Sequence, residues 1–386
     1  MRPTFAQVLA AAILLWSINN LNTIRKIPEM EWRIVSSEKM EEENSSAMDE
    51  CNGDGNANSR MRRRKSKDSP FLLDCAAVVK SQQKKDNYYN TTYINQVRVI
   101  AQPSFTAHLH YALKDKVIST ELMDKGCYEC ETYNALMNVL YRQDRQKTFL
   151  LDIGGNIGLF SLGAAANGYE SVAVEPSLRN WAVFCHSVVA NPYFDKRIRL
   201  HKVALHDKWE PTQLGFKLRN PRNPGATSVV EKVGNAQEGG GEGGEVEGID
   251  YAVAVSIDML DRDGHLPPPK PSVVVKVDVE GYECIALKGA TNYLSKLDIV
   301  YVSIEMTTIR LRDCQNRPEL FDLFTKNRLE PYIFHSHDET WKLVNVHNWT
   351  GWSTNILADS IALNNDRFDI AWSRNPPNST PFSTPY

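Results

Sequence analysis

The segment 149–158, Phe-Leu-Leu-Asp-Ile-Gly-Gly-Asn-Ile-Gly, constrains the fold of this chain more than any other. An apolar run ends at Asp152, a turn with three glycines follows, and the apolar residues 159–166 suit a helix. This order predicts a strand, a tight turn and a helix start. Glycine lets the backbone approach a ligand closely, and a helix start offers free N–H groups and a positive dipole end. We therefore expect a nucleotide-like ligand at the carboxyl end of a parallel sheet.

The kind of nucleotide follows from two acidic residues. Asp152 stands where a dinucleotide-binding Gly-x-Gly-x-x-Gly would have its first glycine, and an acid there would repel a pyrophosphate. It suits a cationic ligand such as S-adenosylmethionine, whose amino-acid end Asp152 would face directly or through water. Glu175 ends the next apolar run, 21 residues after Gly154, where a carboxylate can accept bonds from ribose hydroxyls. The plainer interpretation is a helix-capping Asp and a surface Glu.

A second motif, Val-Val-Val-Lys-Val-Asp-Val-Glu-Gly-Tyr-Glu, covers residues 273–283. It predicts a buried strand that brings Asp278 to its carboxyl end and a helix that Glu280 and Glu283 open. Because the carboxyl ends of central strands line one crevice, Asp278 and Glu280 should lie near the ligand, with Glu305 of the next strand on the same rim. Neighbouring carboxylates shift one another's pKa values, and one of them could serve as a general base. Helix capping is the alternative for Glu280 and Glu283.

Short apolar runs alternate with helical segments after the glycine turn. This alternation predicts an α/β fold with a doubly wound, mostly parallel sheet, to which later segments add edge strands. The expected strands are 149–153, 171–175, 198–203, 252–257, 273–278, 299–305 and 331–335, with one or two more near 341–346 and 360–363. The expected helices are 156–166, 177–190, 281–294 and 318–327.

The composition divides the chain into four parts. Residues 1–24 form a hydrophobic segment, and 25–87 form a polar stem with little to bury. Residues 88–370 form the globular domain, with a core at 148–310 and a flexible Gly/Glu-rich insertion at 234–249. Residues 371–386 form a disordered tail. The basic residues 60–67 of the stem fit a solvated linker, a processing site, a nuclear signal or a phospholipid contact.

Charge and cysteine content exclude some classes. The net charge of −3 gives no indication of a nucleic-acid partner. The 7 cysteines show no spacing typical of a disulfide framework. Cys127 and Cys130 lack the further ligands that zinc needs, so a local disulfide or two free thiols is expected there, and no metal site is assigned.

The hydrophobic segment predicts a secretory-pathway location. Residues 3–24 carry no charge, and membrane anchoring is expected through residues 5–24 as a single-pass signal-anchor of the Golgi or endoplasmic reticulum. A cleaved signal peptide and an amphipathic helix are the alternatives, because the apolar core is short for a span. Basic residues flank both ends, so orientation stays open. The Asn-x-Ser/Thr sequons at Asn44, Asn90, Asn348 and Asn378 permit a lumenal glycoprotein.

Together these motifs resemble the FkbM-type family of S-adenosylmethionine-dependent methyltransferases. The resemblance rests on matching order and spacing over about 160 residues. Its pieces are Leu-Asp-Ile-Gly-Gly-Asn-Ile-Gly, then residues 172–176, 203–207, 256–260, 276–283, 287–290 and 304–305, with Lys-Gly-Cys-Tyr-Glu at 125–129 as a lead-in. It implies the class I methyltransferase fold, a seven-stranded sheet whose last strand is antiparallel, and S-adenosylmethionine as the cofactor.

The resemblance also implies roles for individual residues. The methionine half of the cofactor would be cradled by Asp152, Gly154, Gly155, Asn156 and Gly158. Glu175 would hold the ribose, the segment from Ala204 to Asp207 would lie by the adenine, and Asp278 and Glu280 would face the transfer site. The family often has Ala at the position of Gly155, and often a His where this chain has Thr307. Without that His another base is needed, and His206, His335 and His337 are candidates.

The sequence thus predicts methyl transfer to a hydroxyl of a glycan or small molecule, with Asp278 or Glu280 as base or acceptor-orienting group. One alternative is a catalytically inactive lumenal binding or scaffold protein that keeps the fold. Another is an NAD-dependent oxidoreductase, against which the missing Gly-x-Gly-x-x-Gly speaks. The acceptor and the oligomeric state cannot be inferred, since acceptor pockets are built by loops.

Overall fold

The computed structural model describes residues 69–82, 94–99, 103–110, 115–220, 223–230, 249–267, 270–307, 317–335, 339–343 and 367–380. The chain divides into two units, Met1–Ile34 and Val35–Tyr386, and all of these stretches belong to the second. Among them no helix is both long and apolar enough for a bilayer crossing. The expected anchor at 5–24, residues 234–248 of the expected insertion and the sequons at Asn44, Asn90 and Asn348 lie outside the described residues, whereas Ile249 begins a strand.

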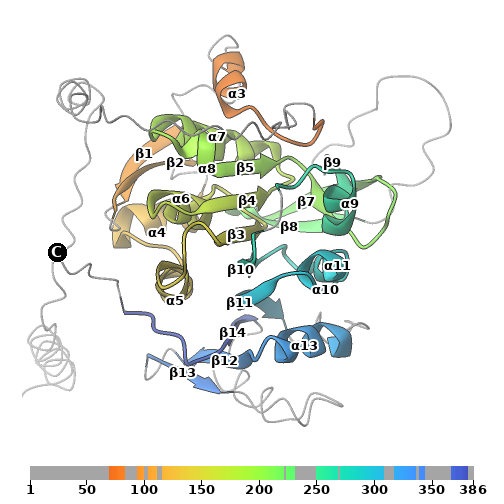
Figure 1. The fold of residues 1–386 in the computed structure, drawn as a ribbon. Helices are drawn as coiled ribbons and strands as arrows, with labels where there is room; N and C mark the ends of the chain where they lie inside the picture. Colours follow the sequence, from red (N-terminus) through yellow and green to blue (C-terminus); the bar gives the residue numbers. More distant parts are fainter. Residues whose placement is uncertain are drawn as a thin grey trace, which may run out of the picture. The chain divides into compact units, whose positions relative to one another are not determined.

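A large mixed sheet forms the centre of the second unit (Figure 1). Its strand order is β13-β12-β14-β11-β10-β3-β4-β5. The bounds are β3 Thr148–Ile153, β4 Glu170–Val174, β5 Ile198–His201, β10 Ser272–Val277, β11 Asp298–Thr307, β12 Glu330–His335, β13 Thr340–Leu343 and β14 Arg367–Ser373. Strands β11, β10, β3, β4 and β5 pair in parallel, and β14 pairs antiparallel with both β11 and β12. The predicted doubly wound, mostly parallel sheet is confirmed.

The sheet has eight described strands where seven were expected. The additional strand is β13, which pairs antiparallel with β12 and forms an edge. The last strand in the chain, β14, lies inside the sheet between β11 and β12, so the antiparallel last strand is also present. The expected strand at 360–363 lies outside the described residues.

Apolar residues face both sides of the sheet, because successive side chains of a strand point to opposite faces. Leu150 and Val274 belong to one buried cluster, while Leu151 and Val275 belong to the other. Figure 1 shows helices on both faces. One set is α4 Ile118–Lys125, α5 Cys130–Tyr141, α6 Leu159–Ala166, α7 Leu178–Ala190 and α8 Phe194–Arg197, and the other is α9 Ile257–Arg262, α10 Glu283–Lys288, α11 Thr291–Leu294 and α13 Arg317–Lys326.

Two smaller sheets complete the described elements. The first pairs β1 (Ile94–Val99) with β2 (Phe105–His110). The second has the order β6-β9-β7-β8, with bounds β6 Ala204–Leu205, β7 Thr212–Asn220, β8 Asn223–Val230 and β9 Ile249–Val255. The expectation that residues 252–257 join the main sheet was therefore wrong, and β7 and β8 were missed. The reason is that β9 pairs along most of its length with β7, a partner that periodicity alone does not reveal.

Two expected helices differ in their bounds. The helix expected at 156–166 begins at Leu159, because Asn156 and Gly158 have positive φ angles of 49° and 92°. The helix expected at 281–294 divides into α10 and α11. The break lies at Gly289, where a Cβ would meet the carbonyl oxygen of His206 at 2.2 Å, so this chain segment passes directly against the segment after β5.

The stem and tail boundaries need correction. Helix α3 (Cys75–Gln82) lies within the expected stem, and a disulfide joins Cys75 to Cys185 of α7. Cys127 pairs with Cys130, and Cys284 is also disulfide-bonded. The spacing of the cysteines did not predict the long-range disulfide, because its two cysteines lie 110 residues apart.

The expected tail also begins too early. Strand β14 crosses the expected domain boundary at 370, and Asn138 Nδ2 donates to the carbonyl oxygens of Asn378 and Thr380.

Candidate active site

The glycine turn follows β3 as expected, and its shape is set by the protein's own packing. The N–H groups of Gly154 and Gly155 both donate to the carbonyl oxygen of Val174, at 3.0 and 2.9 Å. A Cβ on Gly154 would lie 1.7 Å from the carbonyl oxygen of Asp278, and one on Gly158 would lie 2.3 Å from the Phe184 ring. A Cβ on Gly155 would meet nothing closer than 3.4 Å, which agrees with the alanine that is frequent there in the resembled family.

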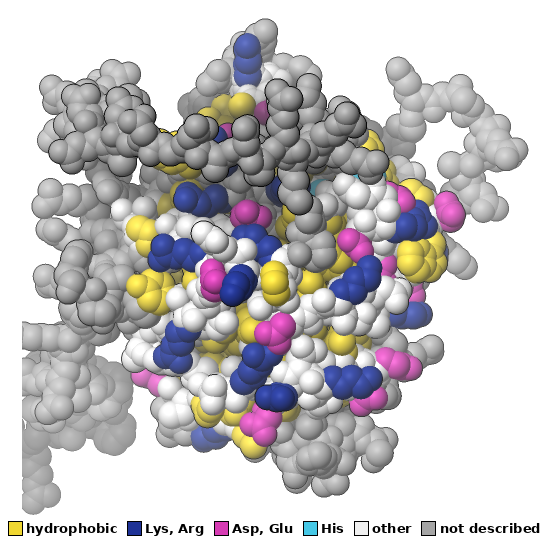
Figure 2. All heavy atoms as spheres, viewed as in Figure 1, with side chains coloured by type: hydrophobic (Ala, Val, Ile, Leu, Met, Phe, Trp, Pro, Cys, Tyr) yellow, Lys and Arg dark blue, Asp and Glu magenta, His cyan; other side chains and the backbone are white. Residues whose placement is uncertain are grey.

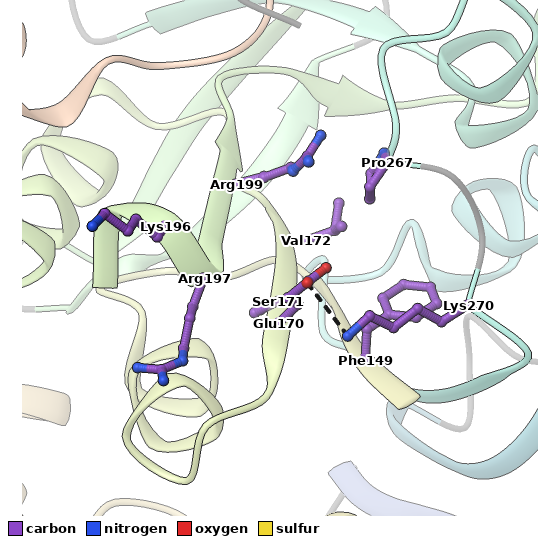
Figure 3. Close-up of a pocket in the computed structure, with 9 residues that line it drawn as sticks. All are labelled: Phe149, Glu170, Ser171, Val172, Lys196, Arg197, Arg199, Pro267 and Lys270. Carbon is purple, nitrogen blue, oxygen red and sulfur yellow. Dashed lines mark ion pairs between the residues drawn. The ribbon is translucent and has the colours of Figure 1, made fainter. Parts of the chain in front are cut away.

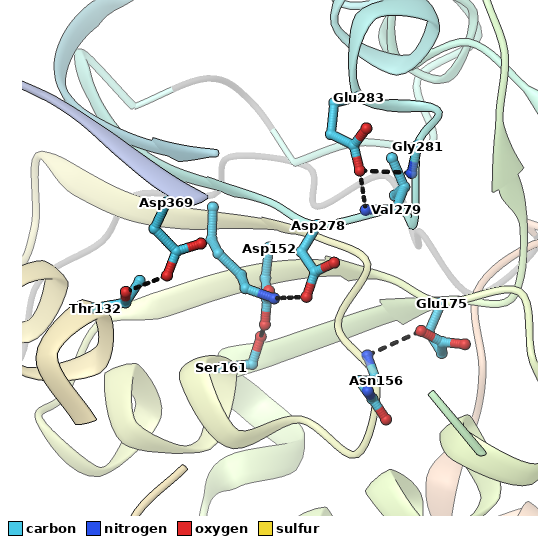
Figure 4. A network of polar contacts seen from close by, with 11 residues as sticks. Thr132, Asp152, Asn156, Ser161, Glu175, Asp278, Val279, Gly281, Glu283 and Asp369 are labelled. Carbon is cyan, nitrogen blue, oxygen red and sulfur yellow. Dashed lines mark hydrogen bonds and ion pairs between the residues drawn. The ribbon is translucent and has the colours of Figure 1, made fainter. Parts of the chain in front are cut away.

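Asp152 is fully buried at the end of β3. Its Oδ2 accepts a 2.5 Å hydrogen bond from Ser161 Oγ (Figure 4). Ser161 Oγ in turn lies 2.7 Å from Ser171 Oγ. Its Oδ1 has no partner among the described residues. Burial raises the pKa of this carboxyl, while the Lys276 ammonium and the Ser161 bonds lower it. Contact between Asp152 and the cofactor stays a prediction, because the structure places this side chain beneath the turn.

Glu175 follows β4 and ties the turn to that strand. Its Oε2 accepts from the Asn156 N–H at 2.8 Å (Figure 4). Its Oε1 accepts from the Ser177 N–H at 2.8 Å. The side chain is only 5% exposed. Burial raises the pKa of Glu175 to about 7, although the backbone N–H groups of Ser177 and Asn156 lower it. A ribose-binding role also stays a prediction.

The two residues expected near the adenine have different surroundings. Ala204 is 4% exposed and packs with Leu214 and Ala254 between β6 and its neighbours, so its side chain belongs to a small core. Asp207 Oδ2 lies 2.7 Å from Lys288 Nζ, and its Oδ1 lies 2.7 Å from His206 Nδ1. Burial raises the pKa of Asp207 but the Lys288 ammonium outweighs it, so the pKa lies below its usual range.

The three histidines considered as alternative bases receive no support. His206 is buried, and its Nδ1 accepts from the Asp207 N–H at 2.8 Å, which gives it a local structural role. The side chain of His335 and the whole of His337 lie outside what the structure describes.

Strand β10 carries the only Lys that is buried among the described residues. Lys276 Nζ lies 3.0 Å from Asp278 Oδ2 and 4.9 Å from the centre of the Phe160 ring. Burial lowers the pKa of Lys276, but the carboxylates of Asp278, Glu129 and Asp152 outweigh this and hold the pKa above its usual range. Lys276 is therefore a permanent positive charge under the carboxyl ends of β3 and β10.

The structure brings together the three carboxylates expected at the transfer site. Asp278, Glu280 and Glu305 are half-buried, and one oxygen of each lies within 4.8 Å of those of the other two. Glu280 has a left-handed backbone, with φ of 54°. Carboxylate oxygens at this spacing are also ligands that hard divalent cations prefer. The prediction of no metal stays a prediction.

Glu283 binds backbone N–H groups of the turn that precedes α10, and its helix-capping alternative stays a prediction. Its Oε1 accepts from the Gly281 N–H at 2.8 Å and from the Val279 N–H at 3.2 Å (Figure 4). Burial raises its pKa to about 7, while these backbone bonds lower it.

Four residues of this region carried no predicted role. Tyr128 and Glu129 come from the loop between α4 and α5, and both are half-buried. Thr132 Oγ1 of α5 donates to Asp369 Oδ2 of β14 at 2.6 Å (Figure 4). In the sequence, the run Lys-Gly-Cys-Tyr-Glu at 125–129 was the pattern that could have indicated Tyr128 and Glu129 as site residues. Asp369 carried no signal, because its position beside Glu305 depends on the pairing of β14 with β11.

A separate pocket lies at the opposite, amino edge of the sheet. It is lined by residues at the starts of β3, β4 and β5, among them Phe149, Glu170 and Arg199. Figure 3 shows Lys196 and Arg197 pointing away from Lys270, which pairs with Glu170 at 3.4 Å. The basic side chains therefore do not converge on one point. On the face in Figure 2, basic and acidic side chains are interspersed.

Comparison with known proteins identifies the domain. Residues 152–343 match the model of the methyltransferase FkbM domain. No curated protein matches the chain.

Solved structures resemble the chain weakly. A precorrin-6y C5,15-methyltransferase from Geobacter metallireducens is 10% identical, with 63% of this chain and 87% of that chain covered and a TM-score of 0.29. A SAM-dependent methyltransferase from Agrobacterium tumefaciens is 10% identical, with coverages of 73% and 70% and a TM-score of 0.35. A human methyltransferase 10 domain containing protein is 12% identical, with coverages of 68% and 97% and a TM-score of 0.32. Likenesses this low carry no information on the reaction or acceptor of this chain.

Proposed function

We propose, from the premise that this chain belongs to the FkbM methyltransferase family through residues 152–343, that it methylates a hydroxyl oxygen of a glycan or small molecule. The family makes S-adenosylmethionine the cofactor. The family match does not specify the methylated atom or the acceptor. That the atom is an oxygen, and that the acceptor is a glycan or small molecule, is our proposal.

One observation carries the proposal: the half-buried carboxylates of Asp278, Glu280 and Glu305 lie within 4.8 Å of one another at the carboxyl ends of β10 and β11. A hydroxyl must lose its proton as it is methylated, and a carboxylate within hydrogen-bond reach can take it. Charged neighbours also orient a polyol by accepting several hydrogen bonds from it. This arrangement favours a hydroxyl acceptor over a carbon acceptor.

The residues present fit the cofactor. S-adenosylmethionine supplies an electrophilic methyl group on a positively charged sulfur. Asp152 has a buried oxygen without a partner among the described residues, and the surrounding acidic side chains favour a cation over a pyrophosphate. Glu175 lies one strand away, where the adjoining β4 ends. We assign cofactor binding to the turn from Asp152 to Gly158 together with Glu175, and acceptor orientation to Asp278, Glu280 and Glu305.

Incubation with S-adenosylmethionine labelled in its methyl group and a panel of glycans, lipids and small molecules tests the function. We expect label on an oxygen of a neutral glycan or small-molecule hydroxyl, located by mass spectrometry. Label on nitrogen or carbon would contradict the oxygen assignment. Calorimetric binding of S-adenosylmethionine without transfer to any member of the panel would favour the non-catalytic scaffold alternative.

We also propose that the chain resides in the secretory pathway, anchored through residues 5–24. Disulfides persist in oxidising compartments and are rare in the cytosol. Cys75–Cys185, Cys127–Cys130 and the bonded Cys284 fit that environment. Asn378 is exposed at the surface, as a glycosylation acceptor must be. Immunofluorescence with Golgi and endoplasmic reticulum markers tests the location, and a mobility shift after glycosidase treatment tests the modification.

A further inference from the structure

The loop between α4 and α5 presents a side chain that the proposed function has not used. Gly126, with φ of 81°, ends α4, and the Cys127–Cys130 disulfide encloses Tyr128 and Glu129. Glu129 has φ of 49°, a left-handed backbone that residues with a Cβ seldom adopt. Its carbonyl oxygen accepts from the Tyr133 N–H at 2.8 Å, so helix α5 starts from it. The loop is therefore fixed by a covalent bond on one side and by α5 on the other.

The Glu129 carboxyl faces charged groups from several elements. Lys276 and Asp278 of β10 and Asp369 of β14 all act on it electrostatically. Asp369 lies opposite Glu305 in the pairing of β14 with β11, and Thr132 of α5 holds it by the 2.6 Å hydrogen bond. Within its own loop, Tyr128 bonds to Glu129 and is close enough to Asp278 and Glu305 to respond to their charges. Glu131 acts on Asp369, and Asp152 acts on Lys276.

Glu129 and Asp369 behave as a pair of carboxyls that interact. Burial raises the pKa of Glu129 to about 8, Lys276 lowers it, and Asp369 and Asp278 raise it further. Burial also raises the pKa of Asp369, which the Thr132 hydrogen bond lowers. The two carboxyls therefore titrate as an interacting pair, and the pKa of each lies above its ordinary value. Both side chains are half-buried, as are those of Asp278 and Glu305, so all four keep partial access to solvent.

We infer that Glu129, held in place by the Cys127–Cys130 disulfide, accepts the proton of the acceptor hydroxyl. This inference rests on the proposed hydroxyl methylation. The acceptor O–H proton moves to the Glu129 carboxylate, and the acceptor oxygen forms the bond to the methyl carbon. The carbon–sulfur bond breaks with its electron pair staying on sulfur, which leaves as the neutral thioether of S-adenosylhomocysteine. Charge and atoms balance without a further reactant.

The same geometry restricts the acceptor. The carboxyl groups of this cluster are those of Glu129, Asp278, Glu280, Glu305 and Asp369, and Lys276 is the one ammonium beside them among the described residues. Such a cluster repels phosphate, sulfate and carboxylate groups and favours a neutral hydroxyl-bearing acceptor.

Proton release on cofactor binding tests Glu129 without an acceptor. A bound sulfonium favours the ionised carboxylate, so Glu129 should release its proton. We expect calorimetry at pH 7, in buffers of different ionisation enthalpy, to show up to about one proton released by the wild type. Glu129→Gln should release few or none and should bind S-adenosylmethionine up to about tenfold more weakly at pH 7, because proton release and affinity are linked. Asp124→Asn, an exposed acid on α4, should match the wild type. Unchanged proton release in Glu129→Gln would overturn the inference.

Transfer to the hydroxyl acceptor found in the labelled panel gives the second test. Glu129→Gln should lower kcat by about 100-fold or more, with a rise of at most about tenfold in the KM for the cofactor. Asp369→Asn removes a charge that raises the pKa of Glu129, so the acidic limb of its kcat profile should shift to lower pH. Wild-type kcat in Glu129→Gln, with a folded protein by thermal unfolding, would overturn the inference and leave the proposed function standing. Failure of the wild type to label any hydroxyl would instead refute the proposed function, and the role of Glu129 with it.

Discussion

Gly154 and Asp278 meet backbone to backbone where β3 and β10 end: a Cβ on Gly154 would lie 1.7 Å from the carbonyl oxygen of Asp278. The Asp278 N–H in turn donates to the carbonyl oxygen of Ile153 at 2.9 Å. The first glycine of the turn therefore joins the turn after β3 to the segment that follows β10. A residue with a side chain at 154 would separate these two parts of the site.

Gly154→Ala should unfold the domain or abolish cofactor binding. The left-handed φ of 81° and the overlap with Asp278 together predict a loss of more than about 2 kcal/mol in the free energy of unfolding. Gly155→Ala is the matched control, because its Cβ meets nothing within 3.4 Å and should cost little. Urea unfolding and calorimetry with S-adenosylmethionine measure both variants. Equal effects of the two substitutions would contradict the explanation.

Lys276→Met should destabilise the domain by about 3–5 kcal/mol, because it leaves buried acidic groups without their counter-charge. Adding Asp152→Asn should recover part of the loss, since one of those acids is then neutral. Lys296→Met serves as the control. Its side chain is 57% exposed and its ion pair with Asp261 is at the surface, so a change within about 1 kcal/mol is expected. Denaturant unfolding of the wild type and the three variants decides the matter, and a double variant no more stable than Lys276→Met would argue against direct pairing.

Stability should fall as pH rises from about 6.5 to 7.5. Burial raises the pKa of Glu175 and of Glu283 to about 7, so the folded state holds their protons more tightly than the unfolded state does. That stabilisation is complete below the ordinary carboxyl pKa of about 4.3 and is lost as pH passes through 7, at up to about 1.4 kcal/mol per pH unit for each group. Buried His108 and His201, with pKa values lowered to about 4, oppose this trend only at lower pH, because above 6.5 they are neutral in both states.

Glu283→Gln should make this pH dependence shallower, since its amide oxygen can still accept the Gly281 N–H without titrating. Glu319→Gln, an exposed residue of α13, should leave the slope unchanged. Unfolding by urea at four pH values across the window measures the slopes. A slope that is the same in wild type and Glu283→Gln would show that Glu283 titrates normally.

Removal of the Cys75–Cys185 bridge should cost about 3–5 kcal/mol, because it closes a loop of 110 residues in the unfolded chain. The Cys127–Cys130 bridge spans a separation of 3 residues, and the same relation predicts a loss of about 2 kcal/mol. Paired Cys→Ala variants, unfolded by urea under identical conditions, provide the comparison. A larger loss from the short loop would mean that native-state contacts outweigh loop entropy.

The sequence by itself determined the parts of this protein that local patterning encodes. The buried runs at β3, β4 and β10 and the glycine turn follow from hydrophobic periodicity and from backbone conformations that glycine alone allows easily. The carboxyl ends of parallel strands share one edge, which is why Asp278, Glu280 and Glu305 could be placed together in advance.

Only the tertiary structure decided which distant segments meet. Asp369 enters the site because β14 inserts between β11 and β12, and Cys75 binds α3 to α7 across 110 residues. The positions of β9 and of Glu129 likewise depend on strand pairing, on a disulfide and on charges contributed by β10 and β14. Contacts between segments far apart in the chain depend on how all the strands pair and bury their apolar side chains together. No local pattern of residues predicts that pairing.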